Sequence, residues 1–129
     1  MSAAALFAGL AGPATEAHAK PPSIAVNCQI AAKIDATAGQ QVCREFISYL
    51  RESFPERDFQ TGADALPRLD LTVTRADDRG IGFGLSWIGA DGTARAGMPL
   101  STSFYDRASD ETLRRRFFKT FLGQNPLPF

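Results

Sequence analysis

The stretch that decides the fold is LDLTVTRADDRGIGFGLSWIGADG, residues 69–92. Apolar and polar residues alternate on both sides of the turn Ala76–Gly80, a pattern typical of antiparallel strands with one buried face. The pair Asp91–Gly92 supplies the positive φ that a second hairpin turn needs. We expect a third strand over residues 93–104, at a sheet edge or broken at Pro99, because proline cannot donate a ladder hydrogen bond.

An amphipathic helix is expected before this meander, over residues 37–53. Apolar residues recur there at three- and four-residue steps and form one face for packing. Asp35 or Thr37 can cap its first turn, and Pro55 ends it.

A second helix is expected over residues 109–122, with Ser109 as its N-cap and Gly123 as its stop. Its first-turn carboxylates lie four residues before arginines, which favours ion pairs within the helix. The expected pairs are Asp110 with Arg114 and Glu111 with Arg115. We therefore interpret Arg114–Arg116 as a solvated helix face rather than an anion site.

Two further strands complete the order. Residues 23–29 (SIAVNCQ) alternate as a first strand, and Phe59–Thr61 form a short one. The order β-α-(β)-β-β-β-α predicts the α+β class. We expect a two-layer sandwich, in which an antiparallel sheet of three to five strands carries both helices on one face.

The composition is that of one ordinary globular domain. The chain has 129 residues, of which 22% are charged, and its 14 basic residues balance 14 acidic ones. That length is typical of a single core. A chain without basic excess is not built to coat nucleic acid or an anionic membrane. No apolar run is long enough to span a bilayer.

The first nineteen residues are typical of a signal peptide cleaved after Ala19. The run Ala3–Gly12 is apolar, and Ala17-His18-Ala19 places small residues before the cleavage point. The basic n-region is missing, which indicates that translation starts upstream or that the signal is incomplete as written. The alternative is an alanine-rich tail on a cytosolic protein. Export leaves one mature domain, residues 20–129.

Removal of this leader restricts the available chemistry. His18 is the only histidine, so the mature domain has no imidazole for acid–base catalysis or metal binding. A serine or cysteine nucleophile could not be paired with histidine. We therefore predict no catalytic activity, no cofactor and no metal site.

Cys28 and Cys43 lie 15 positions apart, unlike the short gaps of zinc or redox motifs. In an exported chain such a pair is most simply a disulfide. It would tie the first strand, or the loop after it, to the first helix. The alternative is a pair of buried reduced thiols.

Two groups of residues are candidate contacts for a partner protein. Gly82 and Gly84 alternate within a strand rather than opening a helix, so they do not form a phosphate loop. They leave a sheet face that a bulky group can approach closely. Phe118, Phe121 and Phe129 carry more aromatic surface than one helix face can easily bury. We expect Trp87 in the core.

Carboxylates that could serve glycan hydrolysis are also present, but nothing in one sequence places two of them across a cleft. Several lie in turns, where aspartate serves backbone geometry. The residues are Asp64, Asp70, Asp77, Asp78, Asp91 and Asp106.

The segments SIAVNCQ, QQVCREFISYLRES, FPERDFQ and the hairpin region quoted first resemble a known domain. This is the small α/β domain at the N-terminus of TolB, shared in outline by the CsgG and LpoB envelope proteins. The resemblance covers residues 23–92 and contains no diagnostic motif. The cysteine pair and the aromatic last helix depart from it. It implies a periplasmic module that binds other envelope proteins and has no active site.

We therefore predict a periplasmic or secreted binding or accessory module that acts through protein contacts in the cell envelope, with its oligomeric state undetermined. One alternative is a small secreted hydrolase that uses carboxylates, which would need two of them in a cleft with one raised pKa. Another is an inhibitor of a secreted enzyme, presenting Asp77–Gly80 or Gly89–Gly92 on a rigid loop.

Overall fold

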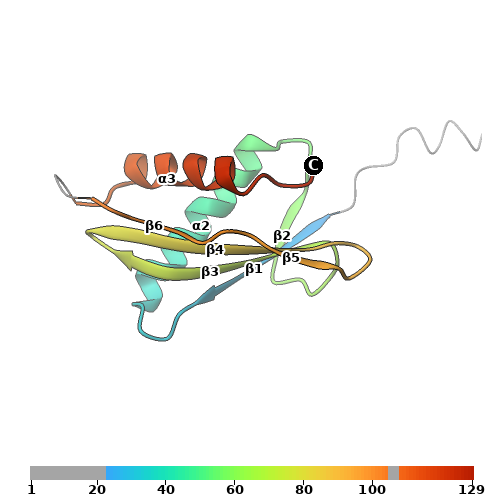
Figure 1. Cartoon of the computed structure of the whole chain (residues 1–129), viewed down its shortest axis with the longest axis horizontal. Helices are drawn as coiled ribbons and strands as arrows, with labels where there is room; N and C mark the ends of the chain where they lie inside the picture. The colour runs from blue at the N-terminus through green and yellow to red at the C-terminus, as the bar shows by residue number, and fades with distance from the viewer. Residues whose placement is uncertain (1–22, 105–107) are drawn as a thin grey trace, which may run out of the picture.

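The structure is a computed structural model that describes residues 23–104 and 108–129. Within them, two helices pack on one six-stranded sheet (Figure 1), which confirms the α+β sandwich and the optional short strand. The expected leader, residues 1–19, lies outside the described residues. The elements are β1 (Ile24–Ile30), α2 (Ala36–Ser53), β2 (Phe59–Thr61), β3 (Arg68–Asp77), β4 (Gly80–Ile88), β5 (Ala94–Ala96), β6 (Leu100–Ser103) and α3 (Glu111–Gln124).

The sheet is mixed and has six strands, so the prediction of an antiparallel sheet of three to five strands is wrong in both direction and number. The strand order is β2-β1-β3-β4-β5, and β6 also pairs with β4. Strand β1 runs parallel to both β2 and β3, whereas β4 is antiparallel to β3, β5 and β6. The cause is α2, which carries the chain back along the sheet so that the next strands start at the same end as β1.

The expected hairpin is present. Leu71 lies opposite Leu85, and Val73 opposite Phe83, with a bulge between Val73 and Arg75. The strand expected over residues 93–104 is broken around Pro99 into β5 and β6. Both lie at the sheet edge beside β4, as the proline predicts.

Both helices begin one residue after an aspartate cap. The Asp35 carboxylate accepts from the Ala38 N–H, which confirms one of the two expected caps of α2. At α3 the cap is Asp110, whose side chain accepts from the Leu113 N–H, so the prediction of Ser109 is wrong. The helix continues through Gly123 to Gln124, and glycine is therefore not its stop.

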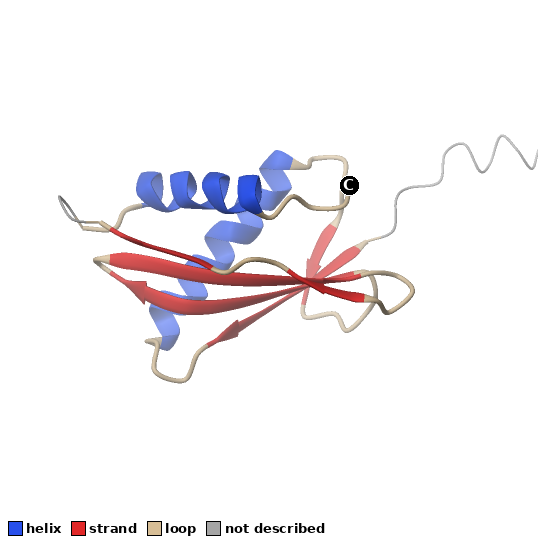
Figure 2. Ribbon diagram, in the orientation of Figure 1, coloured by secondary structure: helices blue, strands red, loops and turns tan. Residues whose placement is uncertain are grey.

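The core lies between the sheet and the two helices (Figure 2). At its centre the ring of Phe46 from α2 lies 4.8 Å from that of Phe83 and 5.2 Å from that of Phe118. These three side chains are fully buried. A disulfide joins Cys28 of β1 to Cys43 of α2 and confirms the predicted pairing.

Candidate functional site

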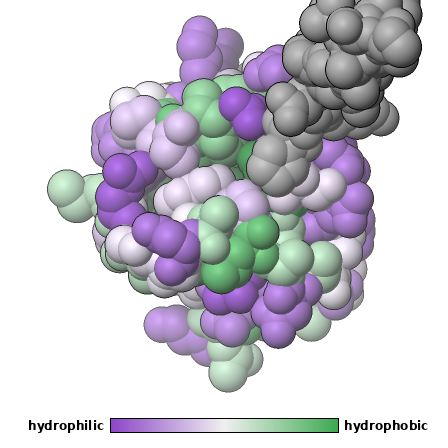
Figure 3. Space-filling view, turned by 90° about the vertical axis from the view of Figure 1, so that its right-hand side faces the viewer, coloured by the Kyte–Doolittle hydropathy of each residue, from purple (hydrophilic) through white to green (hydrophobic). Residues whose placement is uncertain are grey.

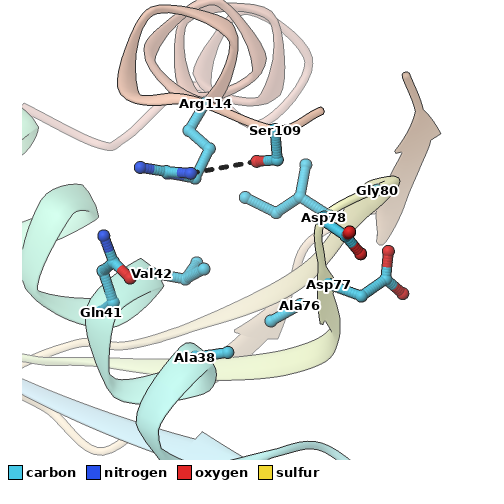
Figure 4. A pocket seen from close by; sticks show the side chains of 10 residues that line it. Ala38, Gln41, Val42, Ala76, Asp77, Asp78, Gly80, Ser109 and Arg114 are labelled. Atoms are coloured by element: carbon cyan, nitrogen blue, oxygen red, sulfur yellow. Dashed lines mark hydrogen bonds between the residues drawn. The ribbon is translucent and has the colours of Figure 1, made fainter. Parts of the chain in front are cut away.

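A polar cavity of about 220 Å³ lies at one end of the sandwich. Three segments form it: the first turns of α2, the turn between β3 and β4, and the start of α3 (Figure 4). Its polar groups come from Gln41, Asp77, Asp78, Ser109 and Arg114. The contacts of these polar groups show what each of them does in the fold.

Arg114 is held on both sides by protein groups. Its guanidinium makes two hydrogen bonds to the Glu45 carboxylate of α2, including Nη2 to Oε2 at 2.9 Å. Its Nη1 donates to Ser109 Oγ at 3.0 Å (Figure 4). The side chains of Arg114 and Glu45 are only 14% and 17% exposed. This arginine joins the two helices and leaves little donor capacity for a ligand.

The expected ion pairs within α3 are replaced by pairs between the helices. Arg115 donates to Glu52 at 2.9 Å, and its guanidinium lies 5.2 Å from the Tyr49 ring. The hydrogen bond from Arg115, together with its positive charge, favours the charged carboxylate and lowers the pKa of Glu52. Of the three arginines interpreted as a solvated face, only Arg116 is exposed.

The Asp77 carboxylate of the cavity is held by the protein's own groups. Asp77 accepts from Arg75 Nε at 3.0 Å and from the Arg79 N–H at 2.8 Å, and these bonds lower its pKa. Hydrolysis by two carboxylates needs one with a raised pKa. Three carboxyl groups have a clearly lowered pKa: Glu52, Asp77 and Asp91. The hydrolase alternative gains no support from this geometry.

Replacing Arg114 by alanine is expected to lower the free energy of unfolding by about 2 kcal/mol, because Glu45 would be left largely buried and without its cation. Arg115→Ala is the matched control on the same helix, since its ion pair is more exposed and should matter much less. Denaturant unfolding of both variants measures the difference. Equal losses for the two would contradict the clamping role of Arg114.

The lowered pKa of Asp77 predicts a small pH dependence of stability. A carboxyl whose pKa is lowered by folding stabilises the protein above its unfolded pKa, and this contribution disappears as the pH falls through the folded pKa. Asp77→Asn should therefore be less stable than wild type at neutral pH, and the gap should close in acid. Unfolding at several pH values tests this, and a gap that widens in acid would refute it.

The aromatic residues expected at a surface contact are largely internal. Phe118 and Phe121 are fully buried, so neither offers surface to a partner in this fold. The sequence argument considered one helix face, whereas α2 and β4 supply facing rings for both. Phe129 is half-buried, with its ring 5.0 Å from that of Phe54 and 5.8 Å from that of Trp87. Trp87 itself is partly buried against the core.

The two glycines of β4 have different surroundings. A Cβ on Gly82 would lie 2.6 Å from Thr74 Oγ1, so the chain's own bulge takes the space beside it. A Cβ on Gly84 would meet nothing within 4 Å. Of the pair, only Gly84 leaves room on the sheet face that the helices do not cover.

Sequence reasoning missed a hollow of about 320 Å³ beneath the C-terminal tail, where Trp87, Arg95 and Leu127 meet. Met98 on its rim is 67% exposed. Buried Asn125 shapes it, because its amide accepts from the Met98 N–H at 2.6 Å and donates to the Met98 carbonyl at 3.0 Å. Figure 3 shows apolar surface among polar groups at this end of the molecule. The only sequence signal was an asparagine just after a helix.

Metal centres and membrane-spanning helices are two other classes of site to consider in the described ranges 23–104 and 108–129. No group of three or more histidine, cysteine or acidic side chains there could hold a metal ion. No helix in those ranges is long and apolar enough to cross a membrane.

No protein-family model and no curated protein matches this sequence. Solved structures share the fold. A single-substitution variant of the PelC dodecamer from Paraburkholderia phytofirmans matches 86% of this chain and 95% of its own, at 12% identity and a TM-score of 0.64. A second crystal form of the PelC dodecamer from that organism matches 82% and 92%, at the same identity and TM-score. The resemblance to the TolB, CsgG and LpoB domains stays a prediction.

Proposed function

We propose that this chain is an exported module of the cell envelope that acts by binding proteins, including further copies of itself, and performs no catalysis. The observation that carries the proposal is the Cys28–Cys43 disulfide, which lies between the first strand and the first helix. Disulfides persist in oxidising compartments and are rare in the cytosol. The apolar run and cleavage pattern of residues 1–19 support the same compartment.

Self-assembly is the second part of the proposal. Its support is the fold shared with PelC, whose structures are dodecamers. The sheet also has a free side: its helix-facing side holds the core, and residues such as Gly84 and Ser86 on the other side are only partly covered. A subunit with an open sheet face and a free sheet edge has surface for repeated contacts.

The absence of catalysis is proposed from the contacts of the polar cavity. Arg114 is held by Glu45 and Ser109, and Asp77 by Arg75 and the turn backbone. These groups stabilise the fold and are not poised for proton transfer. Low exposure of the sheet edge would support the inhibitor alternative, but the outer edge of β6 has no strand partner within the described residues.

The native mass of the purified mature chain, residues 20–129 in the oxidised form, tests the proposal. We expect a defined multiple of the chain mass by sedimentation velocity and by native mass spectrometry. A single subunit at every concentration would contradict self-assembly. Release of sugars or peptides from envelope material would contradict the proposed lack of catalysis.

A further inference from the structure

The strand β6 presents an unpaired edge. Its only strand partner in the described chain is β4. The Phe104 N–H donates to the Arg79 carbonyl, on the side of β4. Because backbone groups alternate along an antiparallel strand, Thr102 and Leu100 face β4 as well. The N–H and C=O groups of Ser101 and Ser103 therefore point away from the sheet.

A groove follows this edge. It lies between β6 and α3, has a volume of about 260 Å³, and is lined on its apolar side by Leu100, Phe104, Leu113 and Phe117. In Figure 1, β6 lies at the margin of the sheet below α3. An added strand would hydrogen-bond to Ser101 and Ser103, and every second side chain would enter the groove.

The opposite edge of the sheet is protected in a way that β6 is not. Strand β2 has only three residues, and its Phe59 carbonyl already accepts from Arg51 Nη2 at 2.9 Å. A side chain on an edge carbonyl blocks the approach of another strand. Among the described residues, nothing similar occupies the outward groups of Ser101 and Ser103.

The charge beside the groove indicates what kind of segment binds there. Arg116 lines the groove, whereas Lys119, one turn later on α3, lines a separate hollow beside Tyr49; both side chains are exposed. Within the described residues neither makes an ion pair, unlike Arg114 and Arg115. Arg116 therefore gives the groove one cation without an ion pair in the described residues, which favours a ligand that brings a carboxylate.

We propose that the β6–α3 groove binds an extended segment of a partner protein by strand addition. The segment carries apolar side chains at alternate positions and a carboxylate that reaches Arg116. This inference rests on the proposed function, because it names the surface and the kind of partner for a protein-binding module. A second copy of the chain is the competing occupant.

A library of random eight-residue peptides displayed on phage is the probe. Wild-type protein should enrich peptides with alternating apolar residues and at least one acidic residue. Ser101→Pro removes an outward N–H while leaving the groups that face β4, so it should weaken binding of a selected peptide by about tenfold or more. Ser101→Ala keeps that N–H and is the matched control.

Two further measurements separate strand addition from other binding. N-methylation of alternate peptide amides should abolish binding in one register and spare it in the other. Arg116→Glu should weaken acidic peptides by about tenfold and leave their neutral analogues unchanged. Circular dichroism confirms that each variant is folded.

Several outcomes would overturn the inference. The first is that no peptides are enriched, and the second is that Ser101→Pro binds them as well as wild type. The third is that Ser101→Pro loses self-association, which would show that a second copy occupies the groove. A protein that self-associates but selects no such peptide overturns this inference and leaves the proposed self-assembly intact. A monomer that binds these peptides supports this inference and contradicts the proposed self-assembly.

Discussion

Phe46→Ala is expected to lower the free energy of unfolding by about 3–5 kcal/mol. The ring is fully buried and lies within 6.0 Å of three other phenylalanine rings, those of Phe83, Phe118 and Phe121. It joins α2, α3 and the sheet, so its removal leaves a cavity on which all three elements border. Urea unfolding measures the loss.

Phe129→Ala is the control for Phe46→Ala. The Phe129 side chain is only half-buried at the end of the chain, so its removal should cost much less. A loss below about 1 kcal/mol for Phe46→Ala would contradict the central position of its ring.

Removal of the disulfide is expected to lower the free energy of unfolding by about 3 kcal/mol, because the Cys28–Cys43 bond closes a loop across 15 positions. A domain of this size has a total stability of about 5–15 kcal/mol. The double variant Cys28→Ala with Cys43→Ala should therefore unfold at much lower urea than the oxidised protein. Reduced wild type should resemble the double variant, and equal stability of oxidised and reduced protein would contradict the stabilising role.

Much of the fold could be predicted because its signals are local. The alternation around Leu71 and Phe83 gave the hairpin, and the proline at position 99 placed the break at the edge. The parallel direction of β1 could not be read from its residues. Strand direction depends on where α2 returns the chain, which is a property of the assembled fold.

The site was less predictable for a similar reason. Arg114 has a carboxylate four residues away in sequence, and local rules favour that pair. In the fold it bonds instead to Glu45, 69 positions away, because the two helices pack against each other. The cap of α3 illustrates a finer limit. Serine and aspartate are both favourable N-cap residues, so the sequence does not decide between Ser109 and Asp110. The path of the backbone into α3 makes Asp110 the cap.

The surface residues followed the same pattern. The sequence identified Phe118 and Phe121 as apolar but could not show that α2 and β4 enclose them. Conversely, no pattern of side chains in the sequence indicates that the backbone N–H and C=O groups of Ser101 and Ser103 point away from the sheet. This orientation becomes visible only once β6 is paired with β4 on one side.

The most direct test of the central claim, export of this module, is the intact mass of the protein from its native host, measured after alkylation with and without reductant. We predict a chain that begins at Lys20 and is alkylated at Cys28 and Cys43 only after reduction. A chain that retains residues 1–19 and has two freely alkylated thiols would contradict both export and the disulfide.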